Sequence, residues 1–173
     1  MSPEPVPTAE LADAAGVPIA MDGRIKPVWR GARLAGGAFT VRTPAGQHRA
    51  VREAAEQAPP GTVLVVDGGG AVDRALWGDK MSALALERGI AGLVVDGAVR
   101  DVSGIEALGF PVFAAAIVPT GPAGRDQPGE QEVEITCGGR PVRPGDFVYA
   151  DADGVVVVPA AAHGDILLRA TSS

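Results

Sequence analysis

Two kinds of apolar spacing alternate along this chain, and each predicts a different secondary structure. Apolar side chains three and four residues apart, followed by Gly or Pro, predict helices at residues 8–15, 50–57 and 79–88. Short apolar or β-rich runs bounded by Gly-containing turns predict strands at residues 62–66, 90–95, 133–136, 147–150 and 155–158. This order of elements indicates a mixed α/β fold.

The length and composition fit one compact domain over residues 1–173. A chain of about 150 residues buries roughly 70% of the surface that its unfolded form exposes, so one core is sufficient. Aromatic residues are few, with four Phe, two Trp and one Tyr, while 24 Gly and 15 Pro separate short elements. We therefore expect a single domain with an aliphatic core.

Charge and cysteine content exclude several functional classes. The net charge is −6 and the basic residues are scattered, so we expect no direct contact with nucleic acid. Cys137 is the only cysteine and cannot form an internal disulfide. The chain has neither a charged-then-apolar leader nor an apolar run of about 18 residues. It is therefore expected to be cytoplasmic and not bound to a membrane.

The helix predicted from Asp79 begins at a candidate anion site. Asp79 is a suitable N-cap, because its carboxylate accepts hydrogen bonds from the first free amides. The amides of Lys80, Met81 and Ser82 then have no partner inside the helix. They lie at the positive end of the helix dipole, where a carboxylate or a phosphate binds favourably.

Arg100 and Asp101 follow the buried strand predicted at residues 90–95. Ligands of α/β sheets bind beyond the carboxyl ends of strands. At such a position Arg100 is suited to bind a carboxylate through two parallel hydrogen bonds, and Asp101 offers hard oxygen ligands to Mg²⁺ or Mn²⁺. The structural alternative is that Asp79 only caps a helix and that Arg100 and Asp101 form a solvated turn or local ion pair.

The segment from Gly78 to Phe113 resembles the RraA-like family. The resemblance is carried by Asp79, the Arg100-Asp101 pair after twenty intervening residues, and the sequence Gly-Phe-Pro-Val-Phe at 109–113. Similarity to the family extends over most of the chain, including residues 8–14, 36–41, 144–146 and 151–155. The family includes 4-hydroxy-4-methyl-2-oxoglutarate and 4-carboxy-4-hydroxy-2-oxoadipate aldolases and the regulator of ribonuclease E activity.

The resemblance implies a metal-dependent lyase. Asp101 would coordinate Mg²⁺ or Mn²⁺ directly, and Asp79 would reach the ion or its waters. Arg100, with Gly78 and the amides of Lys80 and Met81, would hold the carboxylate of the substrate. The implied reaction is retro-aldol cleavage of a 4-hydroxy-2-oxo acid, and oxaloacetate decarboxylation would pass through the same pyruvate enolate.

The same resemblance implies the architecture and assembly of the protein. We expect a single α/β domain with a mixed β-sheet or barrel core flanked by helices. Relatives form trimers or paired trimers, so a homotrimer or a dimer of trimers is expected, with a small 2-keto acid as the substrate.

Two departures from the family pattern leave alternatives open. Where many relatives carry Gly-Asp-Asn, this chain has Gly46-Gln47-His48, and His48 is either a substrate contact or an exposed loop residue without a role. The sequence also stops at Ser173, without the acidic C-terminal extension of the longer aldolases. The alternatives are a non-catalytic regulator of the ribonuclease E type, acting by protein binding, or an RraA-like enzyme with a different reaction.

Residues 119–129 have the composition of a linker and predict a surface excursion within the domain. The same segment is alternatively a lid over the site. In that case Arg125 is the side chain expected to act there.

Overall fold

The computed structural model describes residues 6–172. The ends of the predicted domain, residues 1–5 and residue 173, lie outside this range. The helices are α1 (Thr8–Ala15), α2 (Arg49–Gln57), α3 (Asp79–Glu87), α4 (Val102–Leu108) and α5 (His163–Thr171), with a 3₁₀ turn at Ala160–Ala162. The strands are β1 (Lys26–Pro27), β2 (Leu34–Arg42), β3 (Val63–Asp67), β4 (Gly92–Val99), β5 (Val112–Ile117), β6 (Glu130–Gln131), β7 (Ile135–Cys137), β8 (Arg140–Val142), β9 (Phe147–Asp151) and β10 (Gly154–Val158). Among residues 6–172, no helix combines the length and apolar character that crossing a bilayer requires.

One sheet forms the centre of the fold, in the order β1-β5-β4-β3-β2-β9-β10, and β6 also pairs with β2. Strands β2 to β5 are parallel, whereas β1, β9 and β10 pair antiparallel with their neighbours. The outer edges approach each other: a β-bridge joins Ala20 to Val156, and Lys26 Nζ donates a hydrogen bond of 2.6 Å to the Asp153 carbonyl. The sheet is a nearly closed barrel, which confirms the predicted α/β fold with a mixed sheet or barrel core.

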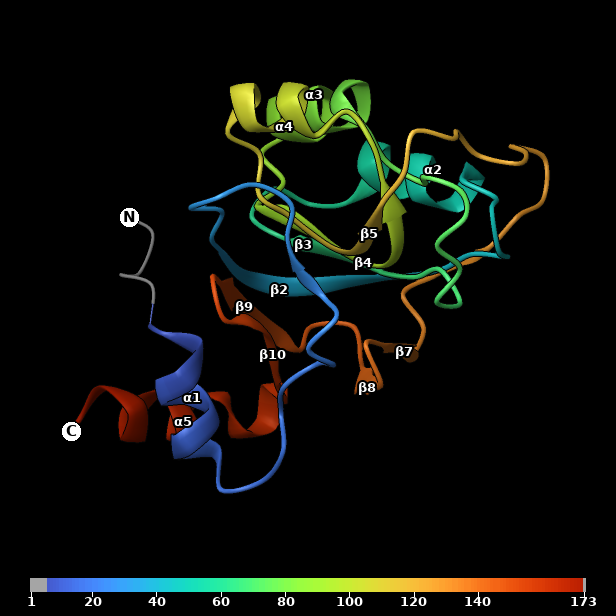
Figure 1. Cartoon of the computed structure of the whole chain (residues 1–173). Coiled ribbons are helices and arrows are strands. Elements are labelled where there is room, and N and C mark those ends of the chain that lie inside the picture. The colour runs from blue at the N-terminus through green and yellow to red at the C-terminus, as the bar shows by residue number, and fades with distance from the viewer. Residues whose placement is uncertain (1–5, 173) are drawn as a thin grey trace.

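Helices cover the barrel in two groups (Figure 1). α2, α3 and α4 lie on one side, whereas α1 and α5 pack against each other beside β9 and β10. Strand β3 lies between two apolar layers: Leu64 and Val66 pack in the cluster under α2 to α4, and Val63 and Val65 pack in the barrel interior. Both faces of this strand are buried, which explains its continuous apolar sequence.

Strand β4 is longer than predicted and carries the chain directly to the site. The predicted strand covered residues 90–95, but β4 continues to Val99 and is buried throughout. The prediction was wrong at this boundary because the charge of Asp96 is compensated by a residue distant in the sequence.

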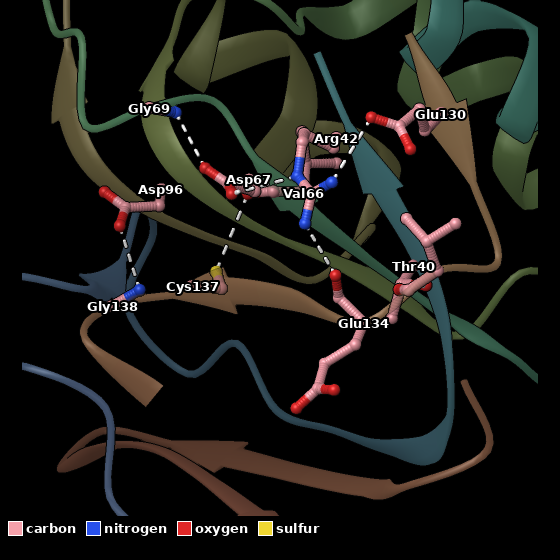
Figure 2. A network of polar contacts seen from close by, with 11 residues as sticks. Thr40, Arg42, Val66, Asp67, Gly69, Asp96, Glu130, Glu134, Cys137 and Gly138 are labelled. Carbon is pink, nitrogen blue, oxygen red and sulfur yellow. Dashed lines mark hydrogen bonds and ion pairs between the residues drawn. The ribbon is translucent and has the colours of Figure 1, made fainter. Parts of the chain in front are cut away.

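The Asp96 carboxylate is buried and fully paired. Arg24 donates hydrogen bonds to its two oxygens at 2.6 and 2.9 Å, and the Gly138 amide donates another at 2.9 Å (Figure 2). Burial alone raises the pKa of Asp96, but the hydrogen bonds from Arg24 and Gly138 outweigh it, so the pKa lies below its ordinary value. This pairing allows a charged side chain inside β4 and attaches the β7–β8 hairpin to the sheet.

We expect Asp96→Asn to lower the free energy of unfolding by about 2 kcal/mol at neutral pH, since it removes the charge that Arg24 and the Gly138 amide bind. The native pKa of Asp96 lies below its unfolded value, so this contribution is complete above the unfolded pKa and is lost as pH falls through the native pKa. Urea unfolding at several pH values checks this, with the exposed Asp73→Asn as control. If Asp96→Asn lowered the free energy of unfolding by the same amount at acidic pH, this prediction would be wrong.

Candidate metal and carboxylate site

The N-terminus of α3 forms one wall of the site. Its cap residue is Gly78, not Asp79 as predicted, and no side chain caps the helix. The Ser82 amide is not free either, because it donates to the Gly78 carbonyl at 3.1 Å. The amides of Lys80 and Met81 have no hydrogen-bond partner among residues 6–172, so two of the three predicted donors remain available.

Asp101 faces this helix end from the start of α4. It is the N-cap of α4 in the left-handed conformation (φ 60°, ψ 39°), which Asp adopts more readily than most residues, and its side chain does not cap α4. Instead, its Oδ2 accepts a long hydrogen bond of 3.5 Å from the Asp79 amide. A Cβ on Gly78 would lie only 2.5 Å from this oxygen. Gly78 therefore leaves the space that the Asp101 carboxylate occupies.

The Asp79 carboxylate lies against α4. A Cβ on Gly104 would come within 2.9 Å of both Cβ and Oδ2 of Asp79, so a glycine is needed in α4 at this contact. Asp79 and Asp101 line the same pocket, from the first turn of α3 and the first turn of α4. The packing of the two helices thus brings both predicted metal-binding carboxylates to one place.

Arg100 connects the site to the segment 119–129. Its backbone amide, next to the end of β4, donates to the Trp77 carbonyl at 2.9 Å. Its guanidinium donates to the Pro119 carbonyl at 3.4 Å, and a Cβ on Gly121 would lie 3.0 Å from Nη1. The Arg100 Nε atom is 3.9 Å from Asp101 Oδ2, and 44% of each side chain is exposed. The guanidinium therefore remains accessible to a ligand.

The pocket has a volume of about 420 Å³. All seven residues predicted to bind substrate or metal line it: His48, Gly78, Asp79, Lys80, Met81, Arg100 and Asp101. The segment 119–129 contributes Pro122 and Arg125, so it borders the site as the lid interpretation predicted. A volume of this size lies within the range of about 300–1,000 Å³ for small-molecule sites.

Sequence reasoning missed two polar residues of the wall, Arg52 and Glu56 on α2. Together with His48, the N-cap of that helix, they recur at every fourth position and so share one helix face. This spacing predicts that Arg52 and Glu56 line the pocket if His48 does. Arg52 and Glu56 also form an ion pair, with Nε and Oε1 3.4 Å apart.

The surroundings of His48 favour its neutral form. Burial lowers its pKa, and the positive charges of Arg125, Arg52 and Arg100 lower it further. Its Nδ1 atom is buried without a hydrogen-bond partner in the described part of the chain. The predicted role of His48 as an exposed loop residue does not fit this environment, because it is half-buried and lines the pocket.

The donor set fits one type of metal ion and not another. No group of three or more His, Cys, Asp or Glu side chains in residues 6–172 is arranged around a common point, as a zinc site would require. Cys137 is also poorly suited, since it is buried and burial raises the pKa of its thiol, which disfavours the thiolate. Mg²⁺, in contrast, keeps several waters and binds through one or two carboxylates plus groups of the substrate. Asp79 and Asp101 match that pattern.

We expect Gly104→Ala to weaken Mn²⁺ binding about tenfold or more, because the added methyl displaces the Asp79 carboxylate. The fold should persist, since alanine favours a helix more than glycine does. Isothermal titration calorimetry with Mn²⁺ measures the effect. Gly164→Ala in α5 is the matched control, because a Cβ there meets no atom within 4 Å. Equal Mn²⁺ affinity in both variants would show that Gly104 does not position the site.

With this geometry established, comparison with known proteins identifies the family. The model of the RraA-like family, described as Aldolase/RraA, matches residues 8–157. This chain therefore belongs to the RraA-like family, as the resemblance of residues 78–113 indicated.

Individual relatives extend over most of the chain. A protein of Halalkalibacterium halodurans named "Putative 4-hydroxy-4-methyl-2-oxoglutarate aldolase" is 39% identical over 170 residues, which cover 95% of this chain and 78% of the relative. A protein of the same name from Burkholderia multivorans is 38% identical, with 87% of this chain and 94% of the relative covered.

Solved structures confirm the fold. The RNA-processing inhibitor RraA from Thermus thermophilis matches with a TM-score of 0.82 at 34% identity, covering 90% of this chain and 94% of its own. An uncharacterized protein from Pseudomonas syringae matches with a TM-score of 0.87 at 32% identity, covering 96% of this chain and 82% of its own. The nearly closed barrel with its two groups of helices is thus the fold of this family.

Proposed function

We propose that this chain is a divalent-metal-dependent lyase that cleaves a carbon–carbon bond of a short 2-oxo acid. One observation carries the proposal: the guanidinium of Arg100, the free amides of Lys80 and Met81, and the carboxylates of Asp79 and Asp101 line a single pocket. A 2-oxo acid offers a carboxylate to the cationic groups and a keto oxygen beside it to a metal ion.

The carboxylate next to the keto group would bind between Arg100 and α3. A guanidinium binds a carboxylate through two parallel hydrogen bonds, and the free amides of Lys80 and Met81 add donors at the positive end of the helix. Arg100 is held by the Pro119 carbonyl and remains partly exposed, so it can bind without a large rearrangement. These contacts would orient the bond to be broken.

Asp101 and Asp79 would hold Mg²⁺ or Mn²⁺ beside this carboxylate. The bound ion supplies Lewis-acid chemistry, which stabilises the negative charge that cleavage leaves on the pyruvate half. In the retro-aldol direction the C4 hydroxyl loses its proton and the C3–C4 bond breaks. Its electron pair stays with the pyruvate half, and C3 later takes up a proton. Asp79 is suited to hold a water that exchanges these protons.

Oxaloacetate decarboxylation belongs to the same proposal. Loss of CO₂ leaves the electron pair on the same carbon of pyruvate, so the same groups would stabilise the charge. The aldolase names of the relatives from Halalkalibacterium halodurans and Burkholderia multivorans support carbon–carbon cleavage as the reaction class. Which of the two reactions dominates depends on the group beyond the broken bond.

A second candidate is regulation by protein binding without catalysis. The similarity to the RNA-processing inhibitor RraA from Thermus thermophilis favours it, since that protein aligns over 94% of its length. Against it stands the pocket, because a surface for protein binding has no need of two carboxylates beside free helix amides and an accessible guanidinium. A family member with a different reaction is the third alternative, and it too would use this pocket.

Pyruvate release tests the proposal. We expect release from oxaloacetate or from 4-hydroxy-2-oxo acids when Mg²⁺ or Mn²⁺ is present, and none after chelation. An assay with metal but without protein corrects for spontaneous decarboxylation. If no substrate yields pyruvate above this blank, the lyase proposal fails, and a pull-down from the native lysate then tests the regulator.

A further inference from the structure

The proposed cleavage moves two protons at different carbons of the substrate. One leaves the C4 hydroxyl as the C3–C4 bond breaks, and the other is taken up at C3. The pyruvate half would be held by Arg100, the first turn of α3 and the carboxylates of Asp79 and Asp101, so C4 lies further from these groups. The rest of the pocket wall, which α2 and the loop 119–129 contribute, is therefore the part that meets the C4 hydroxyl.

Two side chains of this remaining wall have an atom that can accept a proton, His48 and Glu56. Glu56 pairs with Arg52 on the same helix, with Oε1 and Nε 3.4 Å apart. The guanidinium groups of Arg52 and Arg125 carry donors and no acceptor. In His48, Nδ1 is buried without a hydrogen-bond partner among residues 6–172, which leaves Nε2 as the ring nitrogen available to a ligand. His48 is thus the proton acceptor of this wall that no ion pair engages.

The backbone around His48 is fixed from both sides. Its amide donates to the Gly124 carbonyl at 3.2 Å, and its carbonyl accepts from the Arg52 amide in the first turn of α2 at 3.0 Å. Two residues earlier, the Gly46 carbonyl accepts from the Ala123 amide at 2.7 Å. The ring is therefore carried by the junction between α2 and the loop 119–129. Such fixed placement is what a proton-transfer group needs.

The charges around His48 favour an imidazole that is ready to accept a proton. Burial is the largest cause that lowers its pKa, and the positive charges of Arg125 and Arg52 lower it further. The Gly124 carbonyl acts in the opposite sense, and Arg100 adds a smaller lowering. The neutral ring is the form that can act as a base. The same cations would stabilise the negative charge that develops on the C4 oxygen as its proton leaves.

We propose that His48 is a catalytic residue that takes the proton of the C4 hydroxyl in the retro-aldol cleavage. The inference rests on the proposed function for the position of the substrate. The hydroxyl gives its proton to Nε2, the C4 carbonyl forms, and the electron pair of the C3–C4 bond stays with C3. A water held by Asp79 then has to supply only the proton at C3, and His48 releases its proton to solvent. Oxaloacetate has no C4 hydroxyl, so its decarboxylation does not need this base.

The ratio of the two reactions tests this proposal. With Mg²⁺ or Mn²⁺ at saturation, kcat for pyruvate release is measured with 4-hydroxy-2-oxoglutarate and with oxaloacetate. His48→Gln keeps a polar side chain that cannot take up a proton, so it should lower the ratio of the first kcat to the second by about 10²-fold or more. Glu56→Gln alters the other proton acceptor of the wall and is the matched control. It should keep the ratio within about twofold, because it removes only a surface ion pair.

Chemical rescue separates a base from a structural side chain. His48→Ala should lower the same ratio, and added imidazole should raise cleavage of the 4-hydroxy acid by this variant at least about tenfold. Circular dichroism and the remaining oxaloacetate activity show that each variant is folded. A lost ratio that imidazole does not restore would assign His48 a structural role and overturn the inference.

The same measurements distinguish failure of this inference from failure of the proposed function. An unchanged ratio in His48→Gln, or an equal loss in Glu56→Gln, overturns the inference and leaves the lyase intact. Pyruvate release by the native protein from oxaloacetate alone has the same meaning, since no hydroxyl proton is then removed. Pyruvate release from neither acid overturns the proposed function itself.

Discussion

Asp101→Asn is expected to lower metal-dependent pyruvate release by at least about 10³-fold, because it removes the carboxylate best placed to hold the ion. Asn tests the charge more specifically than Ala does, since it keeps the size of the side chain and also tolerates the left-handed conformation at φ 60°. Asp101→Ala should abolish turnover as well, at an added cost in stability of about 1 kcal/mol from that backbone conformation.

The fold should be insensitive to the charge of Asp101. Its side chain is 44% exposed, does not cap α4, and accepts only a long hydrogen bond of 3.5 Å from the Asp79 amide, so the melting temperature of Asp101→Asn should match that of the native protein. Asp165→Asn, an exposed position in α5, is the matched control. Mn²⁺ titration of both variants separates lost metal binding from lost chemistry. Full turnover in Asp101→Asn would remove the basis of the metal proposal.

Arg100→Lys is expected to lower kcat/KM by about 10²-fold, with most of the loss in KM. Lysine keeps the charge but lacks the planar pair of donors that binds a carboxylate at two points. Arg100→Ala should abolish measurable turnover, because the carboxylate then has only the α3 amides. Steady-state kinetics of pyruvate release, with the metal ion at saturation, measures both variants.

Arg74 provides the control that distinguishes ligand binding from loop support. Its guanidinium donates to the Gly121 carbonyl at 3.4 Å, on the same loop that Arg100 contacts, but Arg74 does not line the pocket. Arg74→Lys should therefore leave KM within about twofold, the scale of a surface contact. Equal losses in Arg74→Lys and Arg100→Lys would mean that Arg100 only supports the loop.

The sequence alone determined several helices and strands and singled out Asp79, Arg100 and Asp101 as candidate site residues, but it did not predict α4 or β5. Helical spacing and continuous apolar runs depend on residues that are close in the chain, so they predicted α2, α3, β3 and β10 with small errors at the ends. Asp79 begins helix α3, and Arg100 and Asp101 come directly after the following strand, β4. Strand β4 returns the chain to the end of the sheet at which α3 begins, so these three residues lie together.

Tertiary structure decided the features that depend on contacts between distant segments. Strand β4 passes through Asp96 because Arg24 neutralises it, and the first amide of α3 faces Asp101 rather than a cap of its own. His48 and Arg125 line the same pocket because the loop 119–129 forms backbone hydrogen bonds with the turn before α2. Local sequence cannot predict these contacts between distant residues, since they stabilise the protein only once the barrel has formed.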